Sequence, residues 1–133
     1  MALKTLEYLP GISSEDCRRL RRQGIRHSNQ LLHHVTLAID RQRLAARSGI
    51  SPDRLLEFGH HCSMLEISGM ERALPTVRRL GITTLSQLQA SEVIPLHRQL
   101  SAVLDPTLTP SSAMVAYWIS QARMCNIIED LAA

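Results

Sequence analysis

Arginine side chains gather in one short stretch near the start of this sequence. They are Arg18, Arg19, Arg21, Arg22 and Arg26. At about 100° per residue, the first four fill an arc of about 160° on a helix, with Cys17 and Leu20 on the opposite side. A guanidinium group binds a phosphate through two parallel hydrogen bonds. We therefore predict that this helix buries one face and that its arginine face contacts the backbone of a nucleic acid.

The same arginines allow a second interpretation. Glu15 and Asp16 precede Arg18 and Arg19 at helical spacings of three and four residues, at which opposite charges pair on a helix surface. The face would then be solvated, as most runs of surface charge are. An acidic protein surface would fit it equally well. From the sequence, both interpretations stay open.

Histidine pairs occur at two places and suggest metal binding at first sight. They are His33-His34 and His60-His61, the second followed by Cys62. Neighbouring residues on a helix point about 100° apart, so each pair offers one usable ligand. No C-x-x-C or H-x-x-x-H spacing supports either pair. We expect no metal site and no other cofactor.

The three cysteines, Cys17, Cys62 and Cys125, are odd in number and widely spaced, which predicts reduced thiols rather than disulfides. We expect them to be buried and structural, although the arginines beside Cys17 would lower its pKa if it were exposed. The sequence has no glycine-rich phosphate loop, no nucleophile elbow and a single lysine, Lys4. We therefore predict that the chain is not an enzyme and takes no small-molecule substrate.

Composition limits the elements that can hold these residues. Of 133 residues, 44% are hydrophobic, 20% charged and 3% aromatic, which predicts one compact domain with an aliphatic core. Residues 1–60 carry ten basic and six acidic groups, a net +4, and residues 61–133 carry five and six, a net −1. An anion-binding surface should therefore lie in the first half. No stretch is apolar enough for a membrane span or a signal peptide, so we expect a cytoplasmic protein without membrane contact.

The sequence repeats itself at an offset of close to sixty residues. In residues 9–32 and 67–88, two glycines, an arginine pair and a Gln-Leu pair recur in the same order. Farther along, an apolar set recurs at i, i+3, i+7 and i+10, first as Leu55, Phe58, Cys62 and Leu65 and then as Val115, Trp118, Ala122 and Cys125. We infer a tandem duplication, with one unit over residues 1–64 and a more diverged one over 65–133.

Capping residues divide each unit into helices. Ser13 or Ser14 opens a helix over 14–23 that Gly24 ends in a left-handed conformation. Ser51, followed by Pro52, opens a longer helix that runs toward residue 65. Further helices are expected at 28–35, 40–47, 73–80, 84–89, 92–103 and 112–130. No alternating run of β-branched or aromatic residues survives four positions, so the predicted fold class is all-α.

The sequence LPGI at 9–12, followed by a capped helix and by Gly24-Ile25 thirteen residues beyond Gly11, resembles the helix-hairpin-helix superfamily. Over about residues 5–125 the chain is similar to a bacterial branch of it, a domain of unknown function with two diverged hairpins; residues 44–58 and 111–123 look typical of that branch. The resemblance implies two tandem helix-hairpin-helix-like units packed into one compact domain. For function it implies either DNA binding or protein assembly, because the superfamily serves both.

In DNA-binding members of the superfamily, a Gly-x-Gly hairpin offers backbone N–H groups to a phosphate, and the next helix adds its dipole. The resemblance places this role on Gly11, Ile12 and Ser13, with serine where the second glycine would be. The second hairpin has Glu71 at that place, a carboxylate where the phosphate would lie. It is expected to be a poor phosphate site, and Pro75 suggests that its following helix starts later.

Together these observations favour a non-catalytic module that binds the phosphate backbone of a nucleic acid with little dependence on sequence. The expected contacts are Gly11, Ile12, Ser13, Arg18, Arg19, Arg21, Arg22 and Arg26. The alternative is a protein–protein interaction or assembly factor that uses the helical repeats as a scaffold and binds an acidic protein surface. The missing second glycines, Glu71, the acidic second half and Tyr117, if exposed, support the alternative.

Overall fold

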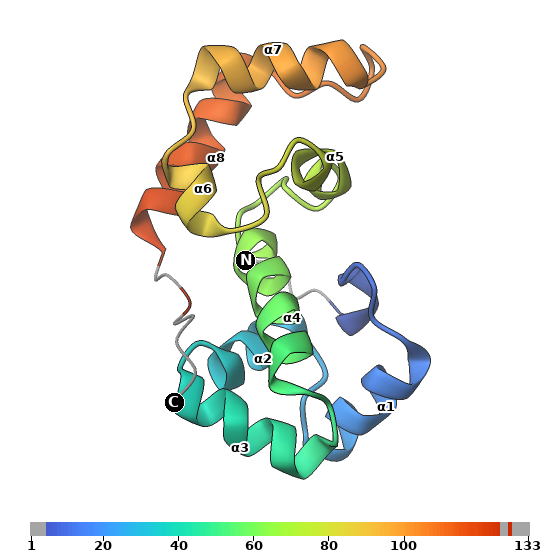
Figure 1. Cartoon of the computed structure of the whole chain (residues 1–133). Helices are drawn as coiled ribbons and strands as arrows, with labels where there is room; N and C mark the ends of the chain where they lie inside the picture. Colours follow the sequence, from blue (N-terminus) through green and yellow to red (C-terminus); the bar gives the residue numbers. More distant parts are fainter. Residues whose placement is uncertain (1–4, 126–127, 129–133) are drawn as a thin grey trace.

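Helices make up nearly all of the regular structure in the described part of the chain. The computed structural model describes residues 5–125 and 128. In chain order the elements are η1 (Leu6–Tyr8), α1 (Ser14–Arg22), α2 (Ser28–Val35), α3 (Ala38–Ser48), α4 (Pro52–Leu65), α5 (Leu74–Arg79), α6 (Leu85–Gln89), α7 (Val93–Val103) and α8 (Ser112–Met124) (Figure 1). An isolated β-bridge joins Thr5 to His27, and no longer strand occurs among these residues. The predicted all-α fold is confirmed.

The same helix end occurs after α1 and after α5. Ile25 donates its N–H back to a carbonyl of α1 at 3.0 Å, and Ile82 donates to α5 in the same way at 3.2 Å. The residues before them, Gly24 and Gly81, adopt φ angles of +80° and +93°. This six-residue backbone motif satisfies carbonyls at the end of a helix and requires a left-handed residue. The helix ends expected from the repeated Gly-Ile pairs are therefore present in both halves.

The turn before each of these helices is repeated as well. In the first turn, the Ile12 N–H donates to the Leu9 carbonyl at 3.3 Å. In the second turn, the Met70 N–H donates to the Ile67 carbonyl at 3.2 Å. Gly11 and Gly69 lie at equivalent positions, with φ angles of +78° and +84°. The order of turn, helix, glycine end and further helices thus occurs twice along the chain.

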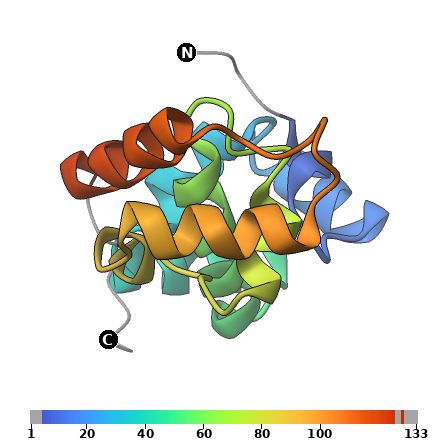
Figure 2. The same cartoon turned by 90° about the horizontal axis from the view of Figure 1, so that it is seen from above.

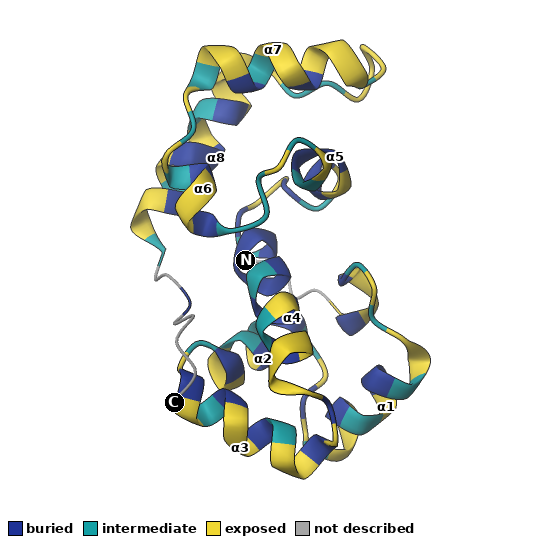
Figure 3. Cartoon of the chain, in the orientation of Figure 1, coloured by how far each residue is buried: buried dark blue, intermediate teal, exposed yellow. Residues whose placement is uncertain are grey.

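One hydrophobic cluster runs through both halves. Helix α4 lies at the centre, packed against α2, α3 and α6, and α8 packs against α6 and α7 (Figures 1 and 2). The two apolar sets predicted on α4 and α8 are buried, apart from the half-buried Cys125 (Figure 3). Helix α4 approaches α2 closely at Gly59, where an added Cβ would lie 2.9 Å from the Val35 side chain. The division of the chain at residues 64 and 65 stays a prediction.

Several helix limits differ from the expected ones. Helix α8 ends at Met124, because Cys125 has an extended backbone with φ −89° and ψ 150°; the remainder of the expected helix, apart from residue 128, lies outside the described residues. Helix α5 begins at Leu74, so Pro75 occupies its first turn, where a missing N–H costs no helical hydrogen bond. No helix among the described residues is long and apolar enough to cross a membrane.

The repeated helix ends predict a matched loss of stability. Nothing lies within 4 Å of a Cβ added at Gly24 or Gly81, so a substitution there costs backbone strain rather than a clash. We expect Gly24→Val and Gly81→Val each to lower the free energy of unfolding by about 2 kcal/mol. Gly24→Asn should cost less than about 1 kcal/mol, since asparagine tolerates this conformation. Urea titration measures the free energy of unfolding of the three variants. If all three were as stable as the wild type, the proposed helix ends would be wrong.

Candidate functional site

Helix α1 presents its arginines on one side, as expected. Ser13 caps it: the Asp16 N–H donates to the Ser13 hydroxyl at 3.0 Å, and the Ser13 N–H donates to the Asp16 carboxylate at 3.1 Å. Cys17 and Leu20 are buried in the core. Arg19 is half-buried, and the other arginines of the cluster are exposed, namely Arg18, Arg21, Arg22 and Arg26. The prediction of one buried and one basic face is confirmed.

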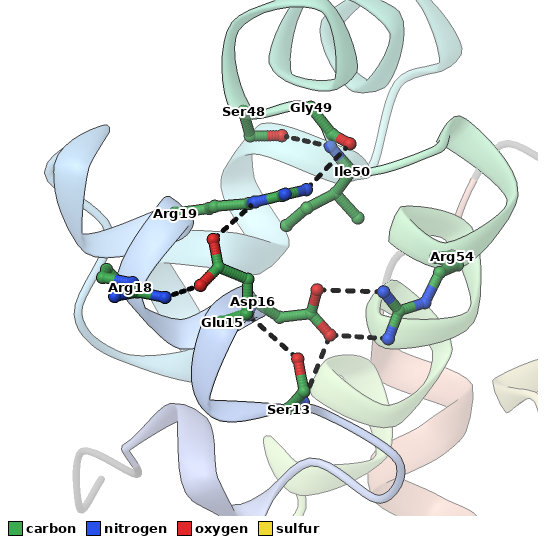
Figure 4. Close-up of polar contacts among 9 residues, drawn as sticks. All are labelled: Ser13, Glu15, Asp16, Arg18, Arg19, Ser48, Gly49, Ile50 and Arg54. Carbon is green, nitrogen blue, oxygen red and sulfur yellow. Dashed lines mark hydrogen bonds and ion pairs between the residues drawn. The ribbon is translucent and has the colours of Figure 1, made fainter.

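Three of the five arginines have carboxylate partners. Glu15 pairs with both Arg18 and Arg19, and the Nε of Arg19 lies 3.0 Å from Oε1 of Glu15 (Figure 4). Arg21 pairs with Glu7, and its hydrogen bond is the main cause that lowers the pKa of Glu7 to about 2. These side chains are largely exposed, so the pairs are screened and weak.

Arg22 and Arg26 differ from their neighbours in the cluster. Neither forms an ion pair with any residue that the structure describes, and both are exposed. Their positive charge is therefore available to a partner. A phosphate could bind these two arginines without displacing a carboxylate partner.

Asp16 pairs with a residue that the sequence did not indicate. Arg54 of α4 donates Nη1 to Oδ1 at 2.9 Å and Nη2 to Oδ2 at 2.5 Å (Figure 4). The Asp16 side chain is only 3% exposed. Burial alone would raise its pKa, but the hydrogen bonds from Arg54 and Ser13 outweigh that effect and lower it. The guanidinium of Arg54 also lies over the ring of Phe58, 5.2 Å from its centre. The pair thus joins α1 to α4.

The first hairpin is engaged with the protein itself. The Ile12 N–H donates to Leu9 and the Ser13 N–H to the Asp16 carboxylate, so an anion already lies at the start of α1. A phosphate there would have to replace these bonds. The contact of Gly11, Ile12 and Ser13 with a phosphate stays a prediction.

Helix α1 meets the end of α3 on its other side. Arg19 donates Nη1 to the Gly49 carbonyl at 3.2 Å, and Gln23 donates Nε2 to the Arg47 carbonyl at 3.3 Å. A recess of about 440 Å³ lies beside these contacts, and both Arg22 and Arg47 line it. No local pattern in the sequence indicates Arg47, because its place beside α1 depends on the packing of α3. The site therefore draws basic groups from two helices.

Comparison with known families identifies the chain. The model of a domain of unknown function, DUF4332, matches residues 10–125. The chain belongs to the DUF4332 family. Comparisons with curated proteins and with solved structures give no match. The family match extends from the first turn to the end of α8 and so covers both halves of the chain.

The histidines do not gather with other metal-binding side chains. In the described ranges no three of the His, Cys, Asp and Glu residues lie close enough to hold an ion. His33 and His34 are exposed. His61 is buried, with Nε2 3.3 Å from Oε1 of Glu57. Burial, helped by the nearby Arg78, lowers the pKa of His61 to about 4.

The cysteines occupy apolar surroundings. Cys17 and Cys62 are buried, Cys125 is half-buried, and all three are free thiols. Burial raises the pKa of each of them. For Cys17 this effect outweighs the neighbouring Arg21, which acts in the opposite direction. The thiols thus lie in environments that suppress the reactive thiolate.

The ion pair between the buried Asp16 and the half-exposed Arg54 predicts coupled effects of two substitutions. Arg54→Met leaves the buried Asp16 carboxylate without its main partner and should lower the free energy of unfolding by about 2 kcal/mol. The double variant Asp16→Leu/Arg54→Met should lose at least about 1 kcal/mol less than the sum of the two single losses. Arg18→Met, which removes an exposed pair, should cost less than about 0.5 kcal/mol. Chemical denaturation measures the free energy of unfolding of Asp16→Leu, Arg54→Met, the double variant and Arg18→Met. If the two single losses simply add in the double variant, the pair does not hold α1.

His61 predicts acid destabilisation in a defined window. Its pKa is lowered in the folded protein to about 4, so the unfolded chain takes up the proton first, near pH 6.5. Stability is therefore complete above pH 6.5 and falls toward pH 4, by roughly 1 kcal/mol per pH unit. His61→Gln should flatten this slope in denaturation curves recorded between pH 7 and 4.5. An unchanged slope would assign the acid sensitivity to other groups.

Proposed function

We propose that this chain is a non-catalytic module that binds the phosphate backbone of a nucleic acid with little sequence preference. The observation that carries the proposal is the exposed state of Arg22 and Arg26, which form no ion pair among the described residues. Arg22 also lines a recess together with Arg47. Arginine is suited to phosphate because its fork of donors matches two oxygens. Contacts to phosphate carry no base information.

The other arginines of α1 can exchange their carboxylate partners for phosphates. Arg18, Arg19 and Arg21 pair with carboxylates at the surface, where such a pair is worth less than about 1 kcal/mol. A phosphate can replace the carboxylate at small cost. The hairpin residues Gly11 and Ser13 would then lie at the edge of the interface, close to the start of the same helix.

The relationship of this chain to the helix-hairpin-helix superfamily is part of the same proposal. The paired turns at Gly11 and Gly69 and the paired helix ends at Gly24 and Gly81 support a relationship to the helix-hairpin-helix superfamily. We propose a bacterial, cytoplasmic member with two diverged hairpins, in a compartment where the free thiols stay reduced.

A salt titration of binding to a random-sequence duplex tests the function. The logarithm of the binding constant should fall linearly with the logarithm of the salt concentration. Arg22→Ala/Arg26→Ala should weaken binding at low salt at least about tenfold and flatten the slope by about two units, one per lost phosphate contact. The matched control Arg72→Ala/Arg98→Ala removes the same charge from exposed positions in the second half and should keep the slope.

The rival function is protein assembly, and one observation favours it. Met114 and Tyr117 of α8 are 40% and 42% exposed, and an exposed tyrosine beside a methionine suits a protein interface. Under this alternative the protein would not bind the duplex even at low salt. It would instead hold a stoichiometric protein partner that Tyr117→Ser releases and Arg22→Ala/Arg26→Ala retains.

A further inference from the structure

Helix α3 carries two arginines that face away from the core. Arg43 and Arg47 are four residues apart, on one side of the helix, and both are exposed. Arg41, by contrast, is buried and donates Nη1 to the Val35 carbonyl at 2.8 Å. That bond fixes α3 against the end of α2. The outward direction of Arg43 and Arg47 is therefore set by packing.

Two recesses meet at Ala46 and Arg47 of α3. The recess beside α1 is lined by Arg19, Arg22, Gln23, Ala46, Arg47, Ser48 and Gly49. A second recess, of about 610 Å³, lies between α2 and α3 and is lined by His33, His34, Asp40, Arg43, Ala46 and Arg47. Ala46 and Arg47 belong to both. The surface is thus continuous from α1 across α3 to α2, and it is called the α1–α3 surface below.

The α1–α3 surface is positively charged. It holds four guanidinium groups, those of Arg19, Arg22, Arg43 and Arg47. Two carboxylates oppose them: Glu15, which pairs with Arg19, and Asp40, whose Oδ1 lies 3.7 Å from Arg43. Two positive charges remain after this pairing, before the histidines are counted. Part of that charge offsets the carbonyl ends of α1 and α3, which finish at this recess.

The chemistry of the lining favours a nucleic acid over a protein. Of the described side chains that line the two recesses, Ala46 is the only apolar one. A protein partner needs an apolar centre with aromatic or aliphatic anchors. Interfaces with nucleic acids are more polar and much more positive. A concave surface lined by four arginines, two histidines, one aspartate and neutral polar side chains fits the second class.

We infer that the phosphate backbone of a nucleic acid crosses the α1–α3 surface, with Arg22, Arg43 and Arg47 as its phosphate ligands and the two exposed histidines of α2 beside them. This inference rests on the proposed function and assigns its site. It moves the centre of the interface from the first hairpin, whose donors already bind Asp16 and Leu9, to the concave surface beside α1.

The test compares Arg43→Ala/Arg47→Ala with the wild type and with the control Arg72→Ala/Arg98→Ala in the duplex titration. Because Arg43 and Arg47 are exposed and Arg41 is kept, the unfolding midpoint in urea should stay within experimental error of the wild type. Duplex affinity at low salt should fall at least about tenfold, and the salt slope should flatten by about two units. The control variant should bind as the wild type does.

The failures can be told apart. If the wild type does not bind the duplex at low salt, the proposed function is wrong and the inference is wrong with it. If the wild type binds, and Arg22→Ala/Arg26→Ala weakens binding while Arg43→Ala/Arg47→Ala does not, only the inference is overturned. If polyglutamate displaces the bound duplex as well as unlabelled duplex does at equal charge, the surface binds an acidic protein chain. The inference is then overturned.

Discussion

The Asp16 carboxylate accepts hydrogen bonds from Ser13 at the start of α1 and from Arg54 on α4. One side chain therefore fixes where α1 begins and where it attaches to the central helix. A carboxylate this deeply buried is costly without its partners, so α1 is held in one position. From that position its basic side faces solvent and the end of α3, and the contact of Arg19 with Gly49 becomes possible. The position of the α1 arginines in the basic surface follows from this one pair.

The second half of the chain has apolar residues at the positions that correspond to Arg54 and Phe58. At an offset of sixty residues, Met114 takes the place of Arg54 and Trp118 that of Phe58. A Cβ added at Gly69, in the second hairpin, would lie 3.6 Å from the Met114 sulfur and 3.6 Å from the Trp118 Nε1, so these side chains of α8 lie against that hairpin. Replacement of a buried ion pair by apolar residues is often neutral for stability. The fold therefore tolerates either version, and the charge concentrated in the first copy is not a requirement of the architecture.

Local signals in the sequence were sufficient for much of the fold. The cap at Ser13 and the left-handed Gly24 act within a few residues of themselves, so short-range rules find them. The apolar spacing of α8 continues to Cys125, yet the backbone there is extended; periodicity alone does not mark that helix end. The partner of Asp16 is 38 residues away, and no local pattern identifies it. The role of Arg47 likewise becomes visible only once α3 is packed beside α1.

Arginine serves two different purposes in this molecule, and burial separates them. Arg41 and Arg54 bind groups that are removed from water, a carbonyl and a carboxylate, and removal of either arginine leaves a buried polar group unsatisfied. Arg18 and Arg21 pair with carboxylates in solvent, where ions in solution screen the attraction and the partner is easily exchanged. A count of basic residues therefore overstates the positive charge that the free protein offers, whereas a count of unpaired basic residues understates the charge that it can offer to a polyanion. In the proposed complex, every phosphate contact would also release counterions from the nucleic acid, so exchange of a weak surface pair for a phosphate would be favoured at low salt. The contacts of Arg41 and Arg54 would keep the helices in place during that exchange.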